Sequence, residues 1–190
     1  MEKIVGHRCW RTLLVTCALH AGAAAAQNLL LNPDFDSDLS HWHTNTSNVW
    51  SEDNSVGFPA AGSAHMVGPA DVSDGLLSDC IVIAGGQDVD LIANVKDAST
   101  FSSINMTIRT YSDGACSLGG DYASQYNFAT PLGNGWMQGS LTTTLPAGIG
   151  SVAIFLRTSG FGGMADTHWD HIRFGPTGSV PVRLQSFEVL

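Results

Sequence analysis

Positive charge is scarce in this sequence. Its 190 residues include 8 lysines and arginines against 17 aspartates and glutamates, so the formal net charge is −9 at pH 7. Proteins that bind nucleic acid or an anionic membrane surface usually carry an excess of basic residues to meet the phosphates. The composition therefore argues against both kinds of partner.

Long apolar runs are missing as well. The apolar stretch at residues 13–19 is too short to span a bilayer. It follows a basic start made by Lys3, Arg8 and Arg11, and the small residues Ala23–Ala26 come after it. This is the pattern of a signal peptide. We therefore predict that residues 1–26 are removed and that the protein is secreted, to the extracellular space or the periplasm, without membrane insertion. Removal shifts the net charge to −11, because three basic residues and one acidic residue are lost.

Cysteine is rare too. Of the four cysteines, Cys9 and Cys17 fall within the predicted signal peptide, so the mature chain keeps Cys80 and Cys116. Two cysteines in an exported chain are expected to form a disulfide, because oxidising compartments favour it. By the chain-entropy argument such a bond adds roughly 3 to 4 kcal/mol. The alternative is two separate buried thiols.

Helical periodicity is nearly absent after residue 27. Apolar and polar residues alternate instead at residues 88–96, 104–109 and 152–157, which is typical of strands with one buried face and one facing water. Clusters of turn-forming residues lie between them, at 84–86, 112–114, 131–135 and 146–148. The sequence thus predicts an all-β fold, one antiparallel β-sandwich over residues 27–175. Residues 176–190 would form a C-terminal tail or an added edge strand.

The stretch Asn28–Trp42 has a distinctive order. An apolar tripeptide at residues 29–31 is followed by a turn at Asn32-Pro33 and by acidic residues around Phe35, which predicts a short buried strand, a sharp turn and an acidic corner. It resembles the opening of the carbohydrate-binding modules of families four, nine and twenty-two, attached to many bacterial cellulases and xylanases. Those modules begin roughly Asn-Leu-Leu-x-Asn-Gly/Pro-x-Phe-Glu and then reach Gly-Trp. Here Asp36 stands in place of the Glu, and His41 replaces the Gly.

Two later segments extend this resemblance. His168–Phe174 is similar to the closing strand of the family, an apolar residue followed by Asp-Asp-Val-x-Leu, with His171 in place of the second Asp. Residues 135–154 resemble the hairpin that the family has in the same place. The resemblance implies a galactose-binding-like jelly roll. It also implies that Trp42, Trp136 and Trp169 are framework residues, which we expect in the core.

The resemblance further implies a structural calcium ion, with Asp36 and Asp170 as ligands, because the two ends of the chain pair in the family. Calcium takes six to eight oxygen ligands at about 2.3 to 2.6 Å, which carboxylates and backbone carbonyls supply. Asp34 and Asp38 lie close enough in sequence to be alternates. The other interpretation is that these aspartates are solvated and cap loop amides.

Histidines flank two of the tryptophans, as His41-x-His43 and His168-x-x-His171. Imidazoles at such spacings can ligate zinc or copper. The alternative is that they are exposed or partly packed loop residues.

A sugar-binding face is the functional expectation. Proteins bind sugars by stacking aromatic rings on C–H groups while polar side chains meet the hydroxyls, so the implied partner is a polysaccharide or oligosaccharide. Trp50 lies in a polar setting, and strand parity places several other residues on outward positions. The candidate ligand-binding residues are Trp50, Arg109, Tyr111, Tyr126, Phe155 and Arg157. The alternative is that these are ordinary exposed aromatic residues.

Catalytic motifs are missing. The sequence has no Gly-x-Ser-x-Gly elbow, phosphate loop or dinucleotide fingerprint. Asp88 and Asp90 have the spacing of a glycosidase pair, but neither is Glu and no third acid follows. We therefore expect a non-catalytic, monomeric carbohydrate-binding-like module. The alternatives are a structural or adhesion β-sandwich without a sugar site and, third, a glycan hydrolase or lyase.

Overall fold

The computed structural model describes residues 27–44, 48–55, 62–68, 73–99, 102–130, 132–133 and 135–179. The predicted signal peptide, residues 1–26, and residues 180–190 of the predicted tail lie outside the described residues. Within the described ranges, no helix is long and apolar enough to cross a membrane.

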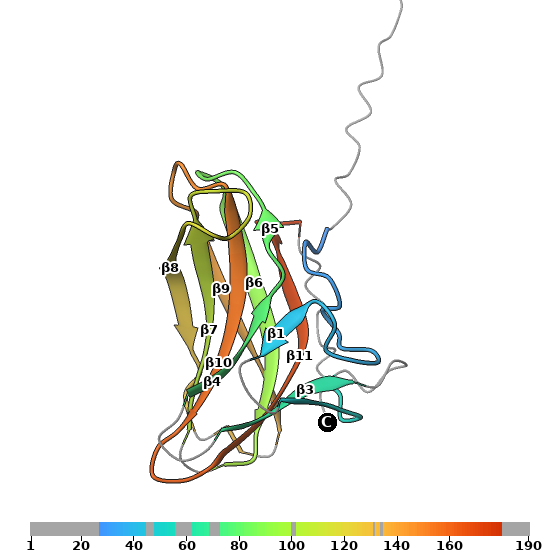
Figure 1. The fold of residues 1–190 in the computed structure, drawn as a ribbon. Coiled ribbons are helices and arrows are strands. Elements are labelled where there is room, and N and C mark those ends of the chain that lie inside the picture. The colour runs from blue at the N-terminus through green and yellow to red at the C-terminus, as the bar shows by residue number, and fades with distance from the viewer. Residues whose placement is uncertain are drawn as a thin grey trace, which may run out of the picture.

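Two antiparallel β-sheets pack face to face in this part of the chain (Figure 1). Sheet A has the strand order β1-β4-β10-β7-β8, with β5 paired to one end of β10. Its strands are β1 (Trp42–Thr44), β4 (Ser73–Ser78), β5 (Ile81–Val82), β7 (Ser102–Tyr111), β8 (Gly119–Asn127) and β10 (Ser151–Gly160). Sheet B has the order β2-β3-β11-β6-β9. Its strands are β2 (Val49–Ser51), β3 (Ser63–Gly68), β6 (Asp88–Asp97), β9 (Trp136–Thr144) and β11 (Ala165–Pro176). The predicted all-β sandwich is confirmed.

The three segments of predicted alternation are the long central strands β6, β7 and β10. Their apolar residues point between the sheets and are buried, and the core comprises among others Val89, Leu91, Val95, Ile104, Met106, Ile108, Val152, Ile154 and Leu156. Residues of alternate parity lie on the outer faces, because successive side chains of a strand point to opposite sides. The period-two pattern thus identified both the strands and their inner faces.

The segment before β1 differs from the prediction. Residues 29–31 form no strand; Leu30 is buried, whereas Leu31 is 57% exposed. The side chain of Asn28 makes hydrogen bonds to β11 that the backbone of a paired strand would otherwise make. Its amide donates to Ile172 O at 3.0 Å, and its oxygen accepts from Phe174 N at 2.9 Å. The chain then turns at Asn32, whose φ of 45° is left-handed, so no regular strand pairing with β11 develops.

The two ends of the domain nevertheless meet, as predicted. Leu29 N donates to Phe174 O and Ile172 N donates to Pro33 O, both at 2.8 Å. The contact lies at an irregularity of β11, where the register with β6 shifts between Asp170 and Arg173. The shift frees the amide of Ile172 from the β6 ladder, and the N-terminal segment takes it up.

The framework tryptophans fall into two groups. Trp42 and Trp169 are 5% and 0% exposed, so both are core residues as predicted. Trp136 is not, because it pairs with Lys96, which in turn pairs with His168. Residues paired in this way share one face of the sheet, here the outer face of sheet B. The expectation of a core Trp136 is therefore wrong.

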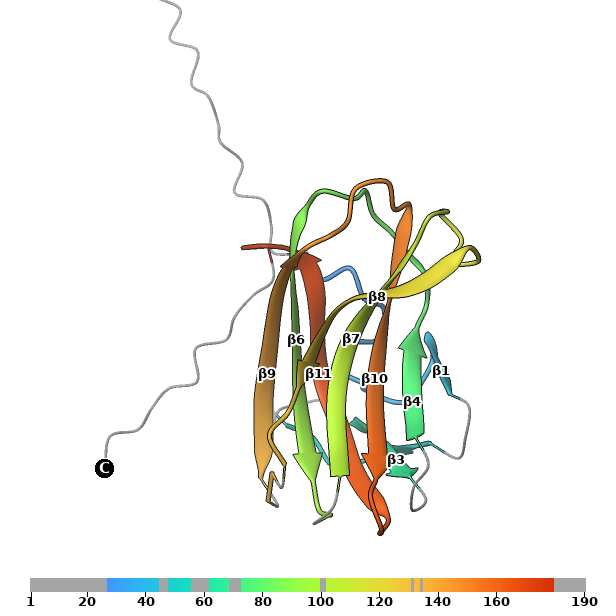
Figure 2. The same ribbon diagram turned by 90° about the vertical axis from the view of Figure 1, so that its left-hand side faces the viewer.

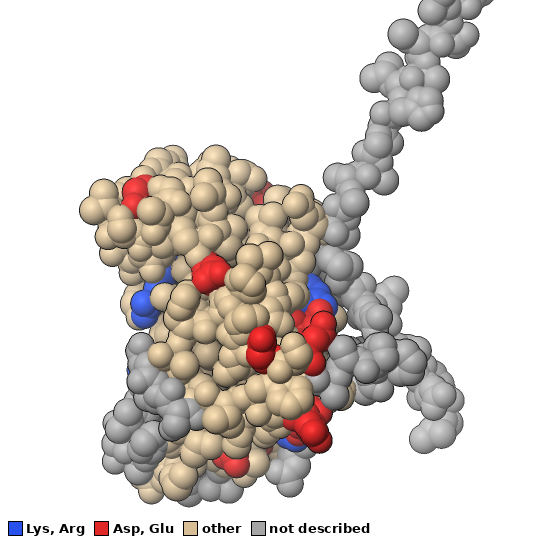
Figure 3. Space-filling model, turned by 45° about the vertical axis from the view of Figure 1, so that its right-hand side comes forward, with Lys and Arg blue, Asp and Glu red and all other residues tan. Residues whose placement is uncertain are grey.

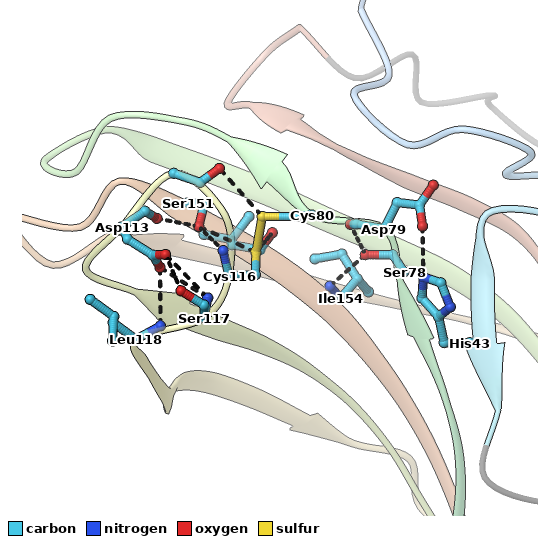
Figure 4. The surroundings of a disulfide bond; sticks show 12 residues. His43, Ser78, Asp79, Cys80, Asp113, Cys116, Ser117, Leu118, Ser151 and Ile154 are labelled. Atoms are coloured by element: carbon cyan, nitrogen blue, oxygen red, sulfur yellow. Dashed lines mark hydrogen bonds and ion pairs between the residues drawn. A yellow bond between two sulfur atoms is a disulfide. The ribbon is translucent and has the colours of Figure 1, made fainter.

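The disulfide is confirmed. Cys80 follows β4, and Cys116 lies in the loop between β7 and β8, with 5.7 Å between their Cα atoms (Figure 4). The Asp113 carboxylate holds this loop by accepting from the amides of Ser117 at 3.0 Å and Leu118 at 3.1 Å. Ser151 Oγ on β10 donates to Asp113 O at 2.6 Å. The bond therefore ties an already ordered loop to the end of β4.

Candidate functional site

The outer face of sheet A carries an aromatic and basic group (the face turned to the viewer in Figure 2). Arg109 of β7 pairs with Ala153 of β10, and Phe155 and Arg157 follow on the same side of β10. On the other side of β7, Tyr122 of β8 pairs with Arg109. Arg109, Phe155 and Arg157 therefore share one outward face, as their parity predicted, and Tyr122 joins them.

Arg109 lies between two aromatic rings. Its Cζ is 4.2 Å from the ring centroid of Phe155 and 5.1 Å from that of Tyr122, and its Nη2 donates to the Tyr122 hydroxyl at 3.0 Å. A guanidinium is attracted to the negative face of an aromatic ring. The three side chains therefore hold one another across three neighbouring strands, a unit that we call the Arg109 stack.

The Arg109 stack also contains an unsatisfied donor. The Nε of Arg109 is buried and has no hydrogen-bond partner among the residues described. Leaving a buried donor unpaired costs about 1 to 3 kcal/mol, and such groups are rare in folded proteins. Ring contacts hold the guanidinium here in spite of that cost.

Gly75 of β4 makes room for the Phe155 ring. A Cβ at this position would lie 2.3 Å from Cε2 of Phe155 and 2.9 Å from the carbonyl oxygen of Leu156. The ring therefore covers the backbone of β4, where any side chain would displace it. A residue without a Cβ is what this packing requires.

Small polar side chains lie between the larger ones. Asn105 and Thr107 have outward parity on β7, yet they are only 3% and 0% exposed, so larger neighbours cover them. On β8, Gln125 and Asn127 pair with Thr107 and Asn105 and are exposed. The face thus combines rings, a guanidinium and amides, which are the groups that recognise sugars in proteins.

The structure does not bring the other predicted residues to this face. Trp50 pairs with Ala64 on the inner side of sheet B; its indole Nε1 donates to Phe35 O at 2.6 Å and its ring packs against the core. Tyr126 pairs with the buried Met106 and packs edge-on against Phe128. The expectation that Trp50, Tyr111 and Tyr126 converge on one open face is therefore wrong.

Tyr111 is an intermediate case. Its pairing with Ser151 gives it the same side of β7 as Arg109. It is nevertheless only 8% exposed, and a Cβ on Gly120 of β8 would lie 3.3 Å from its ring. The backbone of β8 covers this ring. Tyr111 therefore lies at the end of the face but offers no open ring surface for a sugar.

Tyr122 was missed because β8 is irregular. Ser124 pairs with Ile108, but Tyr122 pairs with Arg109, so the register shifts by one residue at Ala123. A bulge of this kind turns all residues beyond it to the opposite face. Tyr122 and Tyr126 have the same parity in the sequence, yet Tyr122 is 59% exposed and Tyr126 faces the core. The Gly119-Gly120 pair next to the bulge was the one hint of irregularity.

Asp170, a predicted calcium ligand, is buried on β11. Its Oδ2 accepts from the amide and the hydroxyl of Ser55, both at 2.8 Å, and its Oδ1 accepts from the amide of His171 at 2.6 Å. Burial raises the pKa of Asp170 in spite of these bonds. Within the described residues it forms no ion pair. A buried carboxylate in this state fits a hard, oxygen-seeking cation.

The other acidic residues of the N-terminal corner have different roles. Asp36 is exposed in the turn that follows Phe35, next to the segment that bonds β11. Asp34 accepts from Arg173 Nη2 at 2.6 and 2.8 Å and lies 3.0 Å from Nδ1 of His171. Asp38 accepts from the amide of Ser40 at 2.9 Å. Of the two proposed alternates, Asp34 is thus engaged by side chains and Asp38 caps a turn.

The histidines do not pair as their sequence spacing suggested. His41 and His43 contact opposite oxygens of Asp79, at 2.8 and 2.7 Å, and both are exposed (Figure 4 shows His43). These bonds, from His41 first, lower the pKa of Asp79. His171 contacts Asp34, whereas His168 stacks on His65 of β3.

Acidic groups elsewhere form no continuous patch on the face shown in Figure 3, where they outnumber the basic groups and lie in separate spots.

Asp88 and Asp90, the pair with glycosidase spacing, lie on the outer face of sheet B. Their carboxylates accept from the hydroxyls of Thr144 and Thr142 across the β6–β9 ladder. Cross-strand bonds of this kind are typical of a structural role.

Comparison with known proteins supports the fold assignment. No protein-family model matches the chain, and no curated relative matches it. Among solved structures, the TmCBM61 module in complex with β-1,4-galactotriose has a TM-score of 0.60 at 15% identity, covering 79% of this chain and 99% of that one. Family 16 carbohydrate-binding module 2 has a TM-score of 0.56 at 13% identity, covering 78% and 99%.

A larger protein matches as well. The enzymatically active domain of bacteriophage CBA120 tailspike protein 4 has a TM-score of 0.62 at 18% identity, covering 78% of this chain. The present chain spans only 21% of that domain's length. At these identities the likeness concerns the fold, a jelly-roll β-sandwich. The resemblance to carbohydrate-binding modules drawn from the sequence is confirmed at that level.

Proposed function

We propose that this protein is an exported, non-catalytic carbohydrate-binding module that binds a polysaccharide or oligosaccharide on the outer face of sheet A. The observation that carries the proposal is the Arg109 stack, in which a guanidinium lies between the rings of Phe155 and Tyr122 on an outward sheet face. The shared fold with carbohydrate-binding modules supports it.

Each part of the face has a function in this proposal. The exposed ring of Tyr122 and the partly exposed ring of Phe155 offer flat apolar surface to sugar C–H groups. The guanidinium of Arg157 and the amides of Gln125 and Asn127 offer hydrogen bonds to hydroxyls. Because Arg109 already holds both rings, little side-chain freedom is lost on binding, which favours affinity. Binding of this kind breaks no bond and requires no general acid or nucleophile.

Export and a monomeric state belong to the same proposal. The Cys80–Cys116 disulfide supports export, because such bonds persist in oxidising compartments. We expect a monomer, which sedimentation of the exported protein tests directly.

The decisive experiment is a binding measurement on soluble galactan, xylan and β-glucan by affinity electrophoresis and calorimetry. The wild type should bind at least one of them, and Phe155→Ala should weaken binding by roughly 1 to 3 kcal/mol, the scale of an interface hot spot. Phe161→Ala is the matched control, since Phe161 is 61% exposed in the turn after β10, away from the Arg109 stack. Equal losses in both variants, or no binding across a broad glycan panel, would leave the structural or adhesion alternative in place.

We also propose that calcium binds at the N-terminal corner, with Asp170 and Asp36 as carboxylate ligands and neighbouring carbonyls completing the shell. The support is that Asp170 is buried and forms no ion pair within the described residues, and that the segment leading to Asp36 bonds β11 through Pro33 O. Bound calcium would supply the positive charge that the buried carboxylate lacks. An ion that binds only the folded state stabilises it by mass action, about 2.7 kcal/mol at a hundredfold excess over Kd.

Thermal melts with chelator and with excess calcium test this proposal. Calcium should raise the melting temperature of the wild type by several degrees, and Asp36→Ala should melt like the chelated wild type and ignore calcium. Asp38→Ala is the control, because Asp38 is a neighbouring exposed acid whose carboxylate accepts from the Ser40 amide and the Asn32 side chain within its own turn; its calcium response should remain. Identical melts of the wild type in both conditions would refute the ion.

A further inference from the structure

Two histidines and an aspartate meet on the outer face of sheet B, on the opposite side of the sandwich from the Arg109 stack. His65 of β3 pairs directly with His168 of β11, and Asp166 precedes His168 by two residues on the same face. His65 Nε2 lies 2.7 Å from Asp166 Oδ1. One ligand atom from each of the three residues lies within 4.8 Å of the other two.

We propose that His65, Asp166 and His168 form a binding site for a divalent transition-metal ion of the zinc type. Imidazole nitrogen and carboxylate oxygen are ordinary zinc ligands, and three protein ligands leave a further position for water or another molecule. The site is open to solvent, because the side chains of His65 and Asp166 are 25% and 47% exposed. Adjacent antiparallel strands hold all three residues, so their backbone positions are defined before any ion arrives, and only side chains have to turn.

The surrounding charges favour a cation. Asp166 is negative, and Lys96 of β6 is already paired with Asp53 of the segment after β2. These three charged groups, two carboxylates and one ammonium, contribute net negative charge around the site. Burial, followed by the nearby His65 and Lys96, lowers the pKa of His168. The shift favours the form of the ring that can offer a lone pair to a metal.

The ion would replace a proton. Without metal, the proton between His65 Nε2 and the Asp166 carboxylate makes their hydrogen bond; with metal, both atoms turn to the ion and that proton goes to solvent. The rings of His65 and His168 stack at 4.4 Å with 9° between their planes. Since a metal lies near the plane of each imidazole that binds it, one of the two rings has to tilt out of this stack.

Trp136 borders the site and makes it observable. Its ring centroid is 6.4 Å from that of His168, and the ammonium of Lys96 lies 5.6 Å from it. Copper(II) bound at the three residues would quench the fluorescence of so close an indole. Trp136→Phe should remove most of that quenching and leave binding intact.

The experiment uses the exported chain without a histidine tag, treated with chelator and dialysed. Calorimetry with zinc chloride should show one ion per chain, and cobalt(II) should give the visible absorption of a nitrogen- and oxygen-ligated ion. His168→Gln should weaken zinc binding at least tenfold. His43→Gln is the matched control, because His43 makes the same kind of contact with an aspartate, Asp79, at an exposed site. It should bind zinc like the wild type.

Asp166→Asn provides a second, more exposed substitution that removes a ligand with less risk to folding, and it should also weaken zinc binding. Three results would overturn the site: no stoichiometric binding of zinc, cobalt, nickel or copper; binding that survives both His168→Gln and Asp166→Asn; or binding lost in His43→Gln. Sugar affinity serves as an independent readout. It should be unchanged in His168→Gln, because the two sites lie on different sheets.

Discussion

The guanidinium carbon of Arg109 on β7 lies 4.2 Å from the ring centroid of Phe155 on the neighbouring strand β10. The two residues are far apart in sequence, and the β7–β10 ladder brings them together with both side chains outward. The contact places a charged group over an apolar ring on the outer face of the sheet, where neither is needed to fill the core. It is the feature on which the proposed binding face depends.

Gly75 is the test of how the Phe155 ring is held. Gly75→Ala should weaken sugar binding about as much as Phe155→Ala, because the new methyl group would occupy the position of the ring edge. It should also cost about 1 to 3 kcal/mol of stability, since the methyl group meets the Leu156 carbonyl as well. Gly114→Ala is the control, because a Cβ there would meet open space. A Gly75→Ala protein that binds and melts like the wild type would contradict this packing.

Trp50 and Trp136 should contribute to stability in the opposite order from the one expected from the sequence, which placed Trp136 in the core and Trp50 on an open face. Trp50→Ala should lower the free energy of unfolding by about 2 to 3 kcal/mol, because a ring packed against the core and a bond to Phe35 O are lost. Trp136→Ala should cost roughly 1 kcal/mol, since that ring lies on an outer face. Urea unfolding of both variants, with Trp169→Ala as the fully buried reference, measures the order. A Trp136→Ala cost above that of Trp50→Ala would reverse it.

The disulfide should be complete in the exported protein. Alkylation under denaturing conditions followed by mass measurement should find no free thiol at Cys80 or Cys116. The double variant Cys80→Ser/Cys116→Ser should lose about 3 to 4 kcal/mol, because the unfolded chain regains the freedom of the closed loop. The reduced wild type should lose the same free energy of unfolding as the double variant. This comparison distinguishes the effect of the disulfide from any effect of the serine side chains. Two alkylated cysteines in freshly exported protein would refute the pairing in the natural product.

Asp34 should make stability depend on pH in the acid range. Burial alone would raise its pKa, but the hydrogen bonds and charges of His171 and Arg173 outweigh burial and hold the pKa below its ordinary value of 3.8. A carboxyl group whose pKa is lower in the folded state stabilises the fold fully above its unfolded pKa. That contribution is lost as the pH falls through the folded pKa.

Asp34→Asn should therefore cost about 2 kcal/mol at neutral pH, since Arg173 is left partly buried without its counter-charge. At about pH 3 and below, the difference from wild type should shrink, because Asp34 is then increasingly protonated in the wild type as well. Urea unfolding across this range checks it. Asp121→Asn, at an exposed position of β8, should show little difference at either pH. A constant gap between Asp34→Asn and wild type would argue against the ion pair as the cause.

Part of the site could be predicted from the sequence, and the residues that were misplaced have identifiable physical reasons. Arg109, Phe155 and Arg157 lie in regular stretches of β7 and β10, so counting by two from buried neighbours placed them outward correctly. Tyr122 and Tyr126 lie on either side of an irregularity in β8, so their common parity in the sequence does not give them a common face. Trp136 lies at the end of an edge strand, where both parities are partly exposed and the sequence pattern is weakest.

The amino-acid sequence by itself determined the class of fold, the central strands with their inner faces, the approach of the two chain ends and the pairing of the cysteines. The fold class, the strands and the disulfide follow from local periodicity, turn chemistry and the number of cysteines, each readable within one segment. The approach of the chain ends is what the resemblance to carbohydrate-binding modules implied. Tertiary structure alone decided which outward residues became neighbours. The register between β7, β8 and β10 assembled the Arg109 stack, and the pairing of β3 with β11 brought His65 to His168 and Asp166. Register depends on how whole strands pack together, because a shift of one residue turns every side chain to the other face while leaving each local pattern unchanged.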